Sequence, residues 1–180
     1  MNRLTTPRLT LRPTSVEDFD DVVALWRDEA FTRFIAPGGR TSEEVWMRLL
    51  RDIGQWSVRG YGNWTVRLSQ TGDYVGSVGA LDFKRVLEPP FDAPEMGWGV
   101  APRFHGTGMA IEALEAALGW CDAVLMAPRT VCMIDPDNAP SLLLAARTGF
   151  REYARTTYKT VPVILFERWN ASPSPLGEGG

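Results

Sequence analysis

A glycine-rich segment between a predicted strand and a predicted helix carries the most specific chemical signal in this sequence. The segment reads Arg103-Phe104-His105-Gly106-Thr107-Gly108. A glycine-rich turn at a helix start exposes unpaired backbone N–H groups, and the helix dipole adds positive potential there. Glycine also lets an anion approach closely, because it has no Cβ. The segment therefore predicts an anion site suited to a pyrophosphate, with a flexible helix-entry turn as the plainer alternative.

The residues that follow this segment exclude two other phosphate-binding loops. A Walker loop ends in Gly-Lys-Ser/Thr, but Gly108 is followed by Met109 and Ala110. The Rossmann fingerprint needs a third glycine three residues after the second, and that position holds Ile111. The loop therefore belongs to neither class.

The composition is that of an ordinary globular chain. The 180 residues suit one domain, and 44% hydrophobic with 23% charged residues is a typical balance. The net charge of −3 argues against general attraction to nucleic acid or acidic membranes. No stretch approaches the ~20 apolar residues of a membrane helix. The first residues, 1–13, lack the apolar run of a signal peptide. We therefore expect a cytoplasmic protein that binds neither nucleic acid nor membrane.

The cysteines and the histidine predict no metal centre. Cys121 and Cys132 are too few for a disulfide framework, and a reducing compartment would keep both thiols free. Core packing is the simplest interpretation of both. His105 is the only histidine, so the sequence contains no recognisable zinc site.

The periodicity of apolar residues predicts a mixed α/β layered domain. Ser15 with Asp18 and Thr41 with Glu44 fit capping boxes at two helix starts. The expected helices cover residues 16–26, 45–56, 106–126 and 140–148, and the expected strands cover 9–11, 62–68, 74–83, 95–100, 130–134, 150–156 and 161–169. The order lacks the regular βαβ alternation of a doubly wound dinucleotide fold. We expect residues 1–170 to form the domain and residues 171–180, rich in serine, proline and glycine, to form a disordered tail.

Several motifs together resemble the GNAT superfamily of acetyltransferases. The pattern Arg103-x-x-Gly106-x-Gly108 is similar to the superfamily's acetyl-CoA pyrophosphate loop, Gln/Arg-x-x-Gly-x-Gly/Ala. Asn138-Ala139-Pro140-Ser141 followed by Gly149-Phe150 resembles the Asn-x-x-Ser…Gly-Phe segment of the ribosomal-protein N-acetyltransferase-like (Rim-type) branch. The opening residues 5–13 resemble the first strand of that branch, and the whole likeness covers roughly residues 4–169.

The resemblance implies a central mixed sheet of about seven strands, with helices on both faces and a splay at the acetyl-CoA site. The strand that ends at Val100 and the strand that starts near Thr130 would diverge, and the pantetheine arm would lie between them. Asn138 would contact the arm, cap the following helix, or do both. The implied cofactor-binding residues are Trp98, Gly99, Val100, Arg103, His105, Gly106, Thr107, Gly108, Met109 and Asn138.

The resemblance also implies the catalytic groups, with one departure. Many members carry a tyrosine seven residues after the asparagine, as acid for the leaving thiolate, but that position is Ala145. Ser141, one helical turn earlier, is the natural replacement, and a plain first-turn serine is the alternative. Glu95, at the head of the central strand, is the expected base, unless it is a solvated strand end. Asp82 is the second candidate base. A backbone N–H near Val100 would polarise the thioester carbonyl.

The implied activity is acetyl-CoA-dependent N-acetylation of a primary amine by direct attack in a ternary complex. The acceptor is a protein amino terminus or a small molecule, and the protein is a monomer or homodimer. Aromatic residues from regions that wall the acceptor pocket in this superfamily are Phe31, Phe34, Trp46 and Tyr158, for which core packing is the alternative. A catalytically weak acyl-CoA-binding or sensing module of the same fold is the competing hypothesis.

Overall fold

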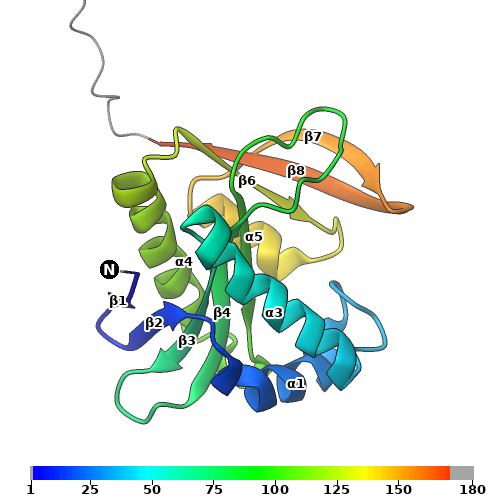
Figure 1. The fold of residues 1–180 in the computed structure, drawn as a ribbon. Coiled ribbons are helices and arrows are strands. Elements are labelled where there is room, and N and C mark those ends of the chain that lie inside the picture. The colour runs from blue at the N-terminus through cyan, green and yellow to red at the C-terminus, as the bar shows by residue number, and fades with distance from the viewer. Residues whose placement is uncertain (1, 171–180) are drawn as a thin grey trace, which may run out of the picture.

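The structure, a computed structural model, describes residues 2–170, and its strands form one eight-stranded sheet (Figure 1). The predicted disordered tail, 171–180, lies outside the described residues. The strand order is β1-β2-β3-β4-β5-β6-β8-β7, and only β5 and β6 pair in parallel. The bounds are β1 Leu4–Thr5, β2 Leu9–Pro13, β3 Asn63–Leu68, β4 Tyr74–Leu81, β5 Glu95–Val100, β6 Arg129–Ile134, β7 Arg151–Tyr158 and β8 Val161–Trp169.

The helices begin and end close to where the sequence predicts them. Their bounds are α1 Phe19–Arg27, α2 Glu29–Thr32, α3 Ser42–Arg59, α4 Met109–Trp120 and α5 Ala139–Arg147. A 3₁₀ turn, Val16–Asp18, leads into α1, and a π-helical turn, Cys121–Leu125, ends α4.

The predicted capping signals act where they were expected. Thr41 accepts a hydrogen bond from the Glu44 backbone at 3.2 Å, and the Glu44 carboxylate accepts the Thr41 N–H at 2.8 Å. Asp18 accepts the backbone N–H of Ser15 at 3.1 Å. These bonds satisfy N–H groups that a helix start leaves without partners.

Three local features differ from the expectation. The sheet gains an eighth strand, because Leu4 of β1 pairs with Leu11 of β2. The helix expected from residue 106 begins at Met109, because Gly106 and Gly108 have φ angles of 73° and 80° and are left-handed. The short helix α2 follows Asp28, whose side chain caps it, and the sequence pattern did not indicate it.

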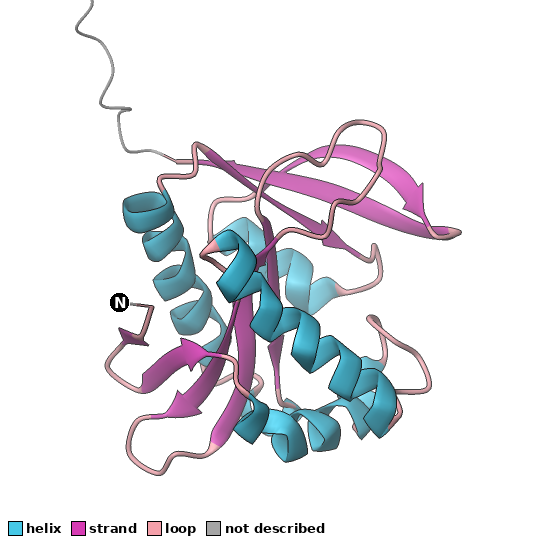
Figure 2. Ribbon diagram, in the orientation of Figure 1, coloured by secondary structure: helices cyan, strands magenta, loops and turns pink. Residues whose placement is uncertain are grey.

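Helices cover both faces of the sheet, as the resemblance implies (Figure 2). Along β3, Trp64 and Val66 pack in the main core with side chains of α4. The alternating residues Thr65 and Arg67 bond instead to Asp18, at the start of α1. Because successive strand side chains point to opposite faces, α1 and α4 lie on opposite sides of the sheet.

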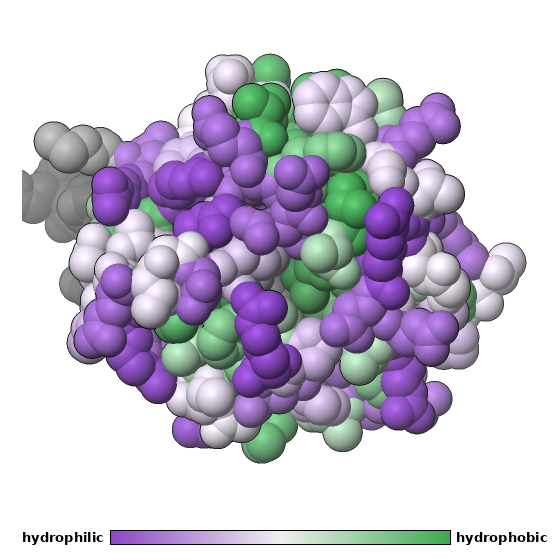
Figure 3. All heavy atoms as spheres, turned by 90° about the horizontal axis from the view of Figure 1, so that it is seen from below, coloured by the Kyte–Doolittle hydropathy of each residue, from purple (hydrophilic) through white to green (hydrophobic). Residues whose placement is uncertain are grey.

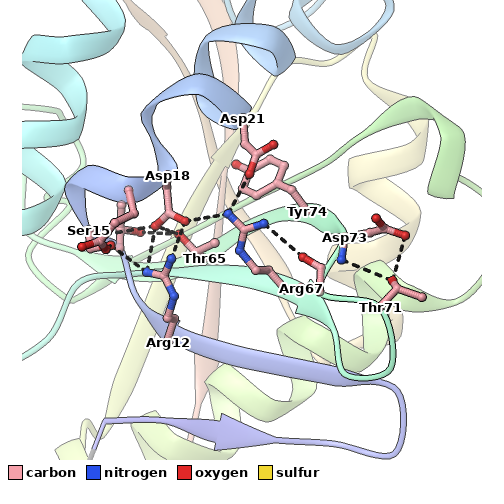
Figure 4. Close-up of polar contacts among 12 residues, drawn as sticks. Arg12, Ser15, Asp18, Asp21, Thr65, Arg67, Thr71, Asp73 and Tyr74 are labelled. Atoms are coloured by element: carbon pink, nitrogen blue, oxygen red, sulfur yellow. Dashed lines mark hydrogen bonds and ion pairs between the residues drawn. The ribbon is translucent and has the colours of Figure 1, made fainter.

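Asp18 is the centre of a buried polar network that joins the first helix to the sheet (Figure 4). It is fully buried and accepts hydrogen bonds from Arg12 of β2 and from Thr65 and Arg67 of β3, at 2.6–3.0 Å. Burial alone would raise the pKa of Asp18. The bonds from Thr65, Ser15, Arg67 and Arg12 outweigh this and lower the pKa below its usual value of 3.8.

The described surface mixes polar and apolar residues. On the face seen in Figure 3, hydrophobic side chains lie scattered among hydrophilic ones. Within residues 2–170, none of the helices combines the length and apolar character that crossing a bilayer requires. The same residues contain no group of three or more histidine, cysteine or acidic side chains able to hold a metal ion.

Candidate functional site

The sheet opens between β5 and β6. Their single register pair joins Glu95 to Val131, supported by a 3.1 Å bond from Val131 N–H to the Pro94 carbonyl. Further along, β5 pairs only with β4, up to Val100 opposite Gly76, and β6 pairs only with β8. The strands therefore diverge towards the carboxyl end of β5. Residues 97–100 of β5 keep one backbone edge turned to the opening.

The glycine-rich loop follows directly at this open end. Residues 102–104 form a 3₁₀ turn, and Gly108 is the N-cap of α4. A Cβ added at Gly106 would meet no atom within 4 Å, so this side of the loop is open. The N–H groups of the first helical turn have no intrahelical acceptors. The loop thus offers an approachable surface of backbone donors at the positive end of α4.

The loop side chains mostly bond back to the protein. Arg103 donates to the Tyr74 carbonyl at 2.8 Å and lies over the ring of Phe104. His105 Nε2 donates to the Val100 carbonyl at 2.9 Å, so this nitrogen carries the proton. The Thr107 hydroxyl donates to the Phe104 carbonyl at 2.6 Å. These bonds shape the loop, and they leave recognition of an anion mainly to the backbone.

The start of α5 lies across the opening from β5. Asn138 is the N-cap and accepts the Ser141 N–H at 3.2 Å, so its capping role is confirmed. The Ser141 hydroxyl accepts a hydrogen bond from the indole N–H of Trp98, at 3.3 Å. Ala145 is fully buried in the main core. The structure thus brings Ser141 beside the middle of β5, while Ala145 points into the packed interior.

The two faces of β5 carry different side chains, because successive residues of a strand point to opposite faces. Met96 and Val100 are buried in the main core, on the same face as Trp98. The opposite face carries Glu95 followed by Gly97 and Gly99. These glycines leave this face bare of side chains next to the Glu95 carboxylate.

Side chains from other elements lie over the bare face. A Cβ at Gly99 would lie 2.8 Å from the ring of Phe31, whereas one at Gly97 would be 3.7 Å from Leu81. Phe31, on α2, also packs edge-on against Trp26, with ring centroids 5.4 Å apart. Phe31 therefore comes close to β5 because residue 99 has no side chain.

Glu95 is held by an arginine from the loop between β4 and β5. Its two carboxylate oxygens accept hydrogen bonds from Arg85 Nε at 2.6 Å and Nη2 at 3.0 Å. The Arg85 guanidinium lies 4.7 Å from the ring centroid of Phe83 and 4.8 Å from that of Tyr158. Burial would lower the pKa of Arg85, but its bonds to Glu95 and Tyr158 outweigh this and raise it.

Asp82, the second candidate base, is also paired. Its carboxylate lies 2.8 Å from Lys84 Nζ and 3.0 Å from Arg59 Nε. The hydrogen bond from Lys84 is the main reason that the pKa of Asp82 is lowered, so Asp82 is a weak proton acceptor at this position. Its backbone carbonyl accepts the Gln55 amide of α3 at 2.9 Å.

The four predicted pocket aromatics separate into two groups. Phe31 contacts β5, and Tyr158 stacks on the arginine that holds Glu95. Trp46 instead packs edge-on against Phe19, between α3 and α1, and Phe34 lies under the guanidinium of Arg33. Only the first two are thus placed at β5 by their contacts.

Sequence reasoning missed two groups at this site. The sequence pattern gives Trp98 a role only through its backbone, and it gives no role to Arg85. Arg85 lies ten residues before Glu95, in a loop with no periodic pattern that could indicate its direction. The sequence signal for a role of the Trp98 side chain is that this tryptophan lies between Gly97 and Gly99 on a predicted strand.

Comparisons with known proteins agree with this geometry. The sequence profile of a family described as an acetyltransferase (GNAT) domain matches residues 8–151. The chain is 24% identical to the protein called uncharacterized N-acetyltransferase p20 of Bacillus licheniformis, over 92% of this chain and 95% of that protein.

Solved structures share the fold over nearly the whole chain. A GNAT-family acetyltransferase of Bordetella pertussis superposes with a TM-score of 0.84 and 32% identity, covering 93% of this chain and 99% of that one. RimL, a ribosomal-protein alpha-N-acetyltransferase solved with coenzyme A, superposes with a TM-score of 0.75 at 18% identity, covering 92% and 96%. The profile match and the Bordetella structure together establish that this chain belongs to the GNAT acetyltransferase family.

Proposed function

We propose that this protein transfers an acetyl group from acetyl-CoA to a primary amine by direct attack, with both substrates bound at once. The arrangement of β5 carries this proposal. The strand has an open edge towards β6, a donor-rich loop at its end, and two faces with different side chains. The RimL structure, which contains coenzyme A, supports the same use of the fold.

The residues around β5 fit acetyl-CoA. The loop of residues 106–108 has an open side on which a pyrophosphate could rest against backbone N–H groups. The backbone N–H and C=O groups on the free edge of residues 97–100 can form hydrogen bonds with an extended pantetheine arm, as they would with a neighbouring strand. Asn138, at the start of α5, borders the other side of the opening.

Ser141 is suited to donating a proton to the departing sulfur. When bound, acetyl-CoA supplies a thioester whose C–S bond breaks as the amine nitrogen bonds to the carbonyl carbon. The indole N–H of Trp98 occupies one lone pair of the Ser141 oxygen. The hydroxyl proton is then free to point elsewhere, and Ser141 passes it to the thiolate while it takes a proton from solvent water in return.

Glu95 is the proposed acceptor of the amine's proton. It lies at the edge of the face of β5 on which Gly97 and Gly99 place no side chains, and Phe31 covers this face at Gly99. Arg85 uses two of the roughly four lone-pair positions of the carboxylate, so the others can take a proton directly or through water. Glu95 and Ser141 thus act from opposite faces of β5, one on the acceptor and one on the thiol.

A catalytically weak acyl-CoA-binding or sensing module is the second candidate function. The observation that favours it is that Glu95 and Asp82 are both held by cationic side chains. If these pairs stay closed when substrates bind, the site lacks an effective base.

One experiment separates the two functions. Purified protein is supplied with acetyl-CoA and a panel of peptides with free amino termini, lysine peptides, polyamines and small amines. Free thiol release is followed, while calorimetry measures CoA binding in parallel. We expect amine-dependent thiol release. Binding without turnover of any acceptor supports the binding module, and absence of CoA binding contradicts both functions.

The acceptor that we propose is a polypeptide amino terminus or a small-molecule amine, modified by a monomer or homodimer. We propose the cytoplasm as its location. The two cysteines, Cys121 and Cys132, are free and buried, which suits a reducing compartment.

A further inference from the structure

The hairpin of β1 and β2 holds the first turn of α4 through Glu112. One oxygen of this carboxylate accepts the Thr6 hydroxyl at 2.6 Å and the Arg8 backbone N–H at 3.0 Å. The other oxygen accepts Arg8 Nε at 2.6 Å. Burial would raise the pKa of Glu112, but the bonds from Thr6 and Arg8 outweigh it and lower the pKa. The carboxylate therefore anchors Arg8.

The anchored Arg8 also reaches the glycine-rich loop. Its Nη1 donates to the Thr107 carbonyl at 2.9 Å. Its Nη2 lies 3.3 Å from the position that a Cβ on Gly108 would occupy. The guanidinium is planar and rigid, so the bond to Glu112 also fixes the direction in which Arg8 donates to Thr107. Arg8 thus links α4 to the loop just before it.

The bond to Thr107 restricts the peptide that joins Thr107 to Gly108. In a trans peptide, the carbonyl and the following N–H point in opposite directions. Holding the Thr107 carbonyl towards Arg8 therefore turns the Gly108 N–H away from Arg8. Without that bond the peptide could rotate, because a glycine with a φ angle of 80° also has other conformations of similar energy.

We propose that Arg8 is a positioning residue of the cofactor site, fixing the Thr107–Gly108 peptide so that its N–H faces the CoA pyrophosphate. This inference rests on the proposed function for the identity of the ligand. Arg8 acts through the loop and places a positive charge beside it. It does so from a segment about a hundred residues away in the sequence, since its bond to Thr107 spans 99 positions.

The test compares CoA with 3′-dephospho-CoA, which keeps the pyrophosphate and lacks the ribose phosphate. Calorimetry measures both ligands with wild type, Arg8→Ala, Arg8→Lys and Arg155→Ala. Arg155 is the matched control, because its ion pair, with Glu152 at 2.7 Å, lies within β7. We expect Arg8→Ala to bind both ligands about tenfold more weakly, since a hydrogen-bonding charged group is lost. Arg155→Ala should bind them like wild type.

Arg8→Lys separates geometry from charge. Lysine keeps the charge but cannot bond Glu112 and Thr107 in one fixed plane, so its affinity should stay close to that of Arg8→Ala. Full recovery by lysine would show that charge alone matters. A loss seen with CoA but absent with 3′-dephospho-CoA would mean that Arg8 binds the ribose phosphate directly. Either result, or an unchanged affinity of Arg8→Ala, overturns the proposal.

Two further measurements guard against a folding defect. Melting temperatures are compared first, and Glu112→Gln, which weakens the anchor of Arg8, replaces Arg8→Ala if that variant does not fold. In turnover assays, KM for acetyl-CoA should rise while kcat at saturation is retained. If the wild type itself binds no CoA, the proposed function fails; if it binds CoA and the Arg8 and Glu112 variants bind equally well, only the inference on Arg8 fails.

Discussion

At the scale of single residues, the pairing of Glu95 with Arg85 has the largest consequence for the proposed chemistry. A carboxylate with both oxygens bonded to a guanidinium has fewer lone pairs for an incoming amine. Arg85 leaves other lone-pair positions of the carboxylate unused, so we propose that the amine's proton reaches Glu95 directly or through a water. The identity of the base can therefore be tested at Glu95 itself.

Glu95→Gln should lower kcat while CoA affinity is kept. The amide preserves the shape and removes the basicity, and loss of a general base typically costs ~10²–10⁴-fold in rate. The loss should shrink at high pH, because more of the amine is already neutral. Thiol release across a pH series measures this, with Glu152→Gln as a control carboxylate on β7 that pairs with Arg155. A wild-type rate for Glu95→Gln near neutral pH would mean that the base is elsewhere.

Ser141 and Trp98 should act as one unit. Ser141→Ala should lower kcat by less than Glu95→Gln, because a thiolate is a tolerable leaving group and water can replace the hydroxyl. Its defect should grow with pH if proton donation becomes limiting. Trp98→Phe removes only the N–H that orients the hydroxyl and should cause a smaller loss.

A double-mutant cycle tests that coupling. In the Ser141→Ala background, Trp98→Phe should change kcat little further, because the group that it orients is already absent. Additive losses would show that Trp98 affects the rate through packing, for example against Phe150, whose ring centroid lies 6.3 Å away.

At the scale of elements, the proposed binding of the cofactor depends on the junction of β5, the loop and α4. Gly106 is the better position to perturb, because it has a φ angle of 73° and open space where a Cβ would be. Gly108 is less suitable, since a Cβ there would approach Arg8. Asparagine and aspartate tolerate the left-handed region better than other side chains do, so both can be placed at 106.

Gly106→Asp should lose CoA affinity by at least about tenfold, and Gly106→Asn should lose much less. The two side chains have nearly the same shape, so the difference between them measures repulsion between a carboxylate and the pyrophosphate. Calorimetry with CoA at low and moderate salt checks this, and the gap should narrow as salt screens the charge. Equal affinities for the two variants would mean that the pyrophosphate binds elsewhere.

At the scale of the whole molecule, the network of Asp18 ties α1 to the sheet. Asp18 is fully buried, and Arg12 and Arg67 both form ion pairs with it. Removing one partner from a buried ion network typically costs about 3 kcal/mol. The network lies beside β2 and β3, so its loss should lower the stability of the whole domain. It does not include β5, so the reaction rate can be measured separately from this loss of stability.

Asp18→Asn should lower the free energy of unfolding near pH 7 by about 3 kcal/mol. Because the folded-state pKa of Asp18 is lowered, its contribution is present above the unfolded value of 3.8 and is lost as pH falls through the folded value. The stability gap between wild type and variant should therefore narrow below about pH 4. Urea unfolding at several pH values measures the gap, and a gap that stays constant down to pH 2 would contradict this role.

The elements and the glycine-rich turn before α4 could be predicted because their signals are local. Capping boxes at Thr41 and Ser15, alternation along β3 and the glycines at 106 and 108 act within a few residues. The physical rules for helix starts, strands and left-handed turns apply to them directly. The ordered set of motifs also indicated the GNAT family, which the comparisons confirm.

The partners of the chemical groups could not be predicted in this way, because they depend on which elements the fold brings together. Trp98 meets Ser141 across 43 residues, and Arg8 meets Glu112 across 104. Both contacts exist only once β5 and β6 diverge and the β1–β2 hairpin packs on α4. Arg85 is close to Glu95 in sequence, yet its direction is set by stacking between Phe83 and Tyr158, from separate segments. Local periodicity carries no information on such contacts, so only the packed sheet and helices determine which carboxylates are paired and which N–H groups stay available to a ligand.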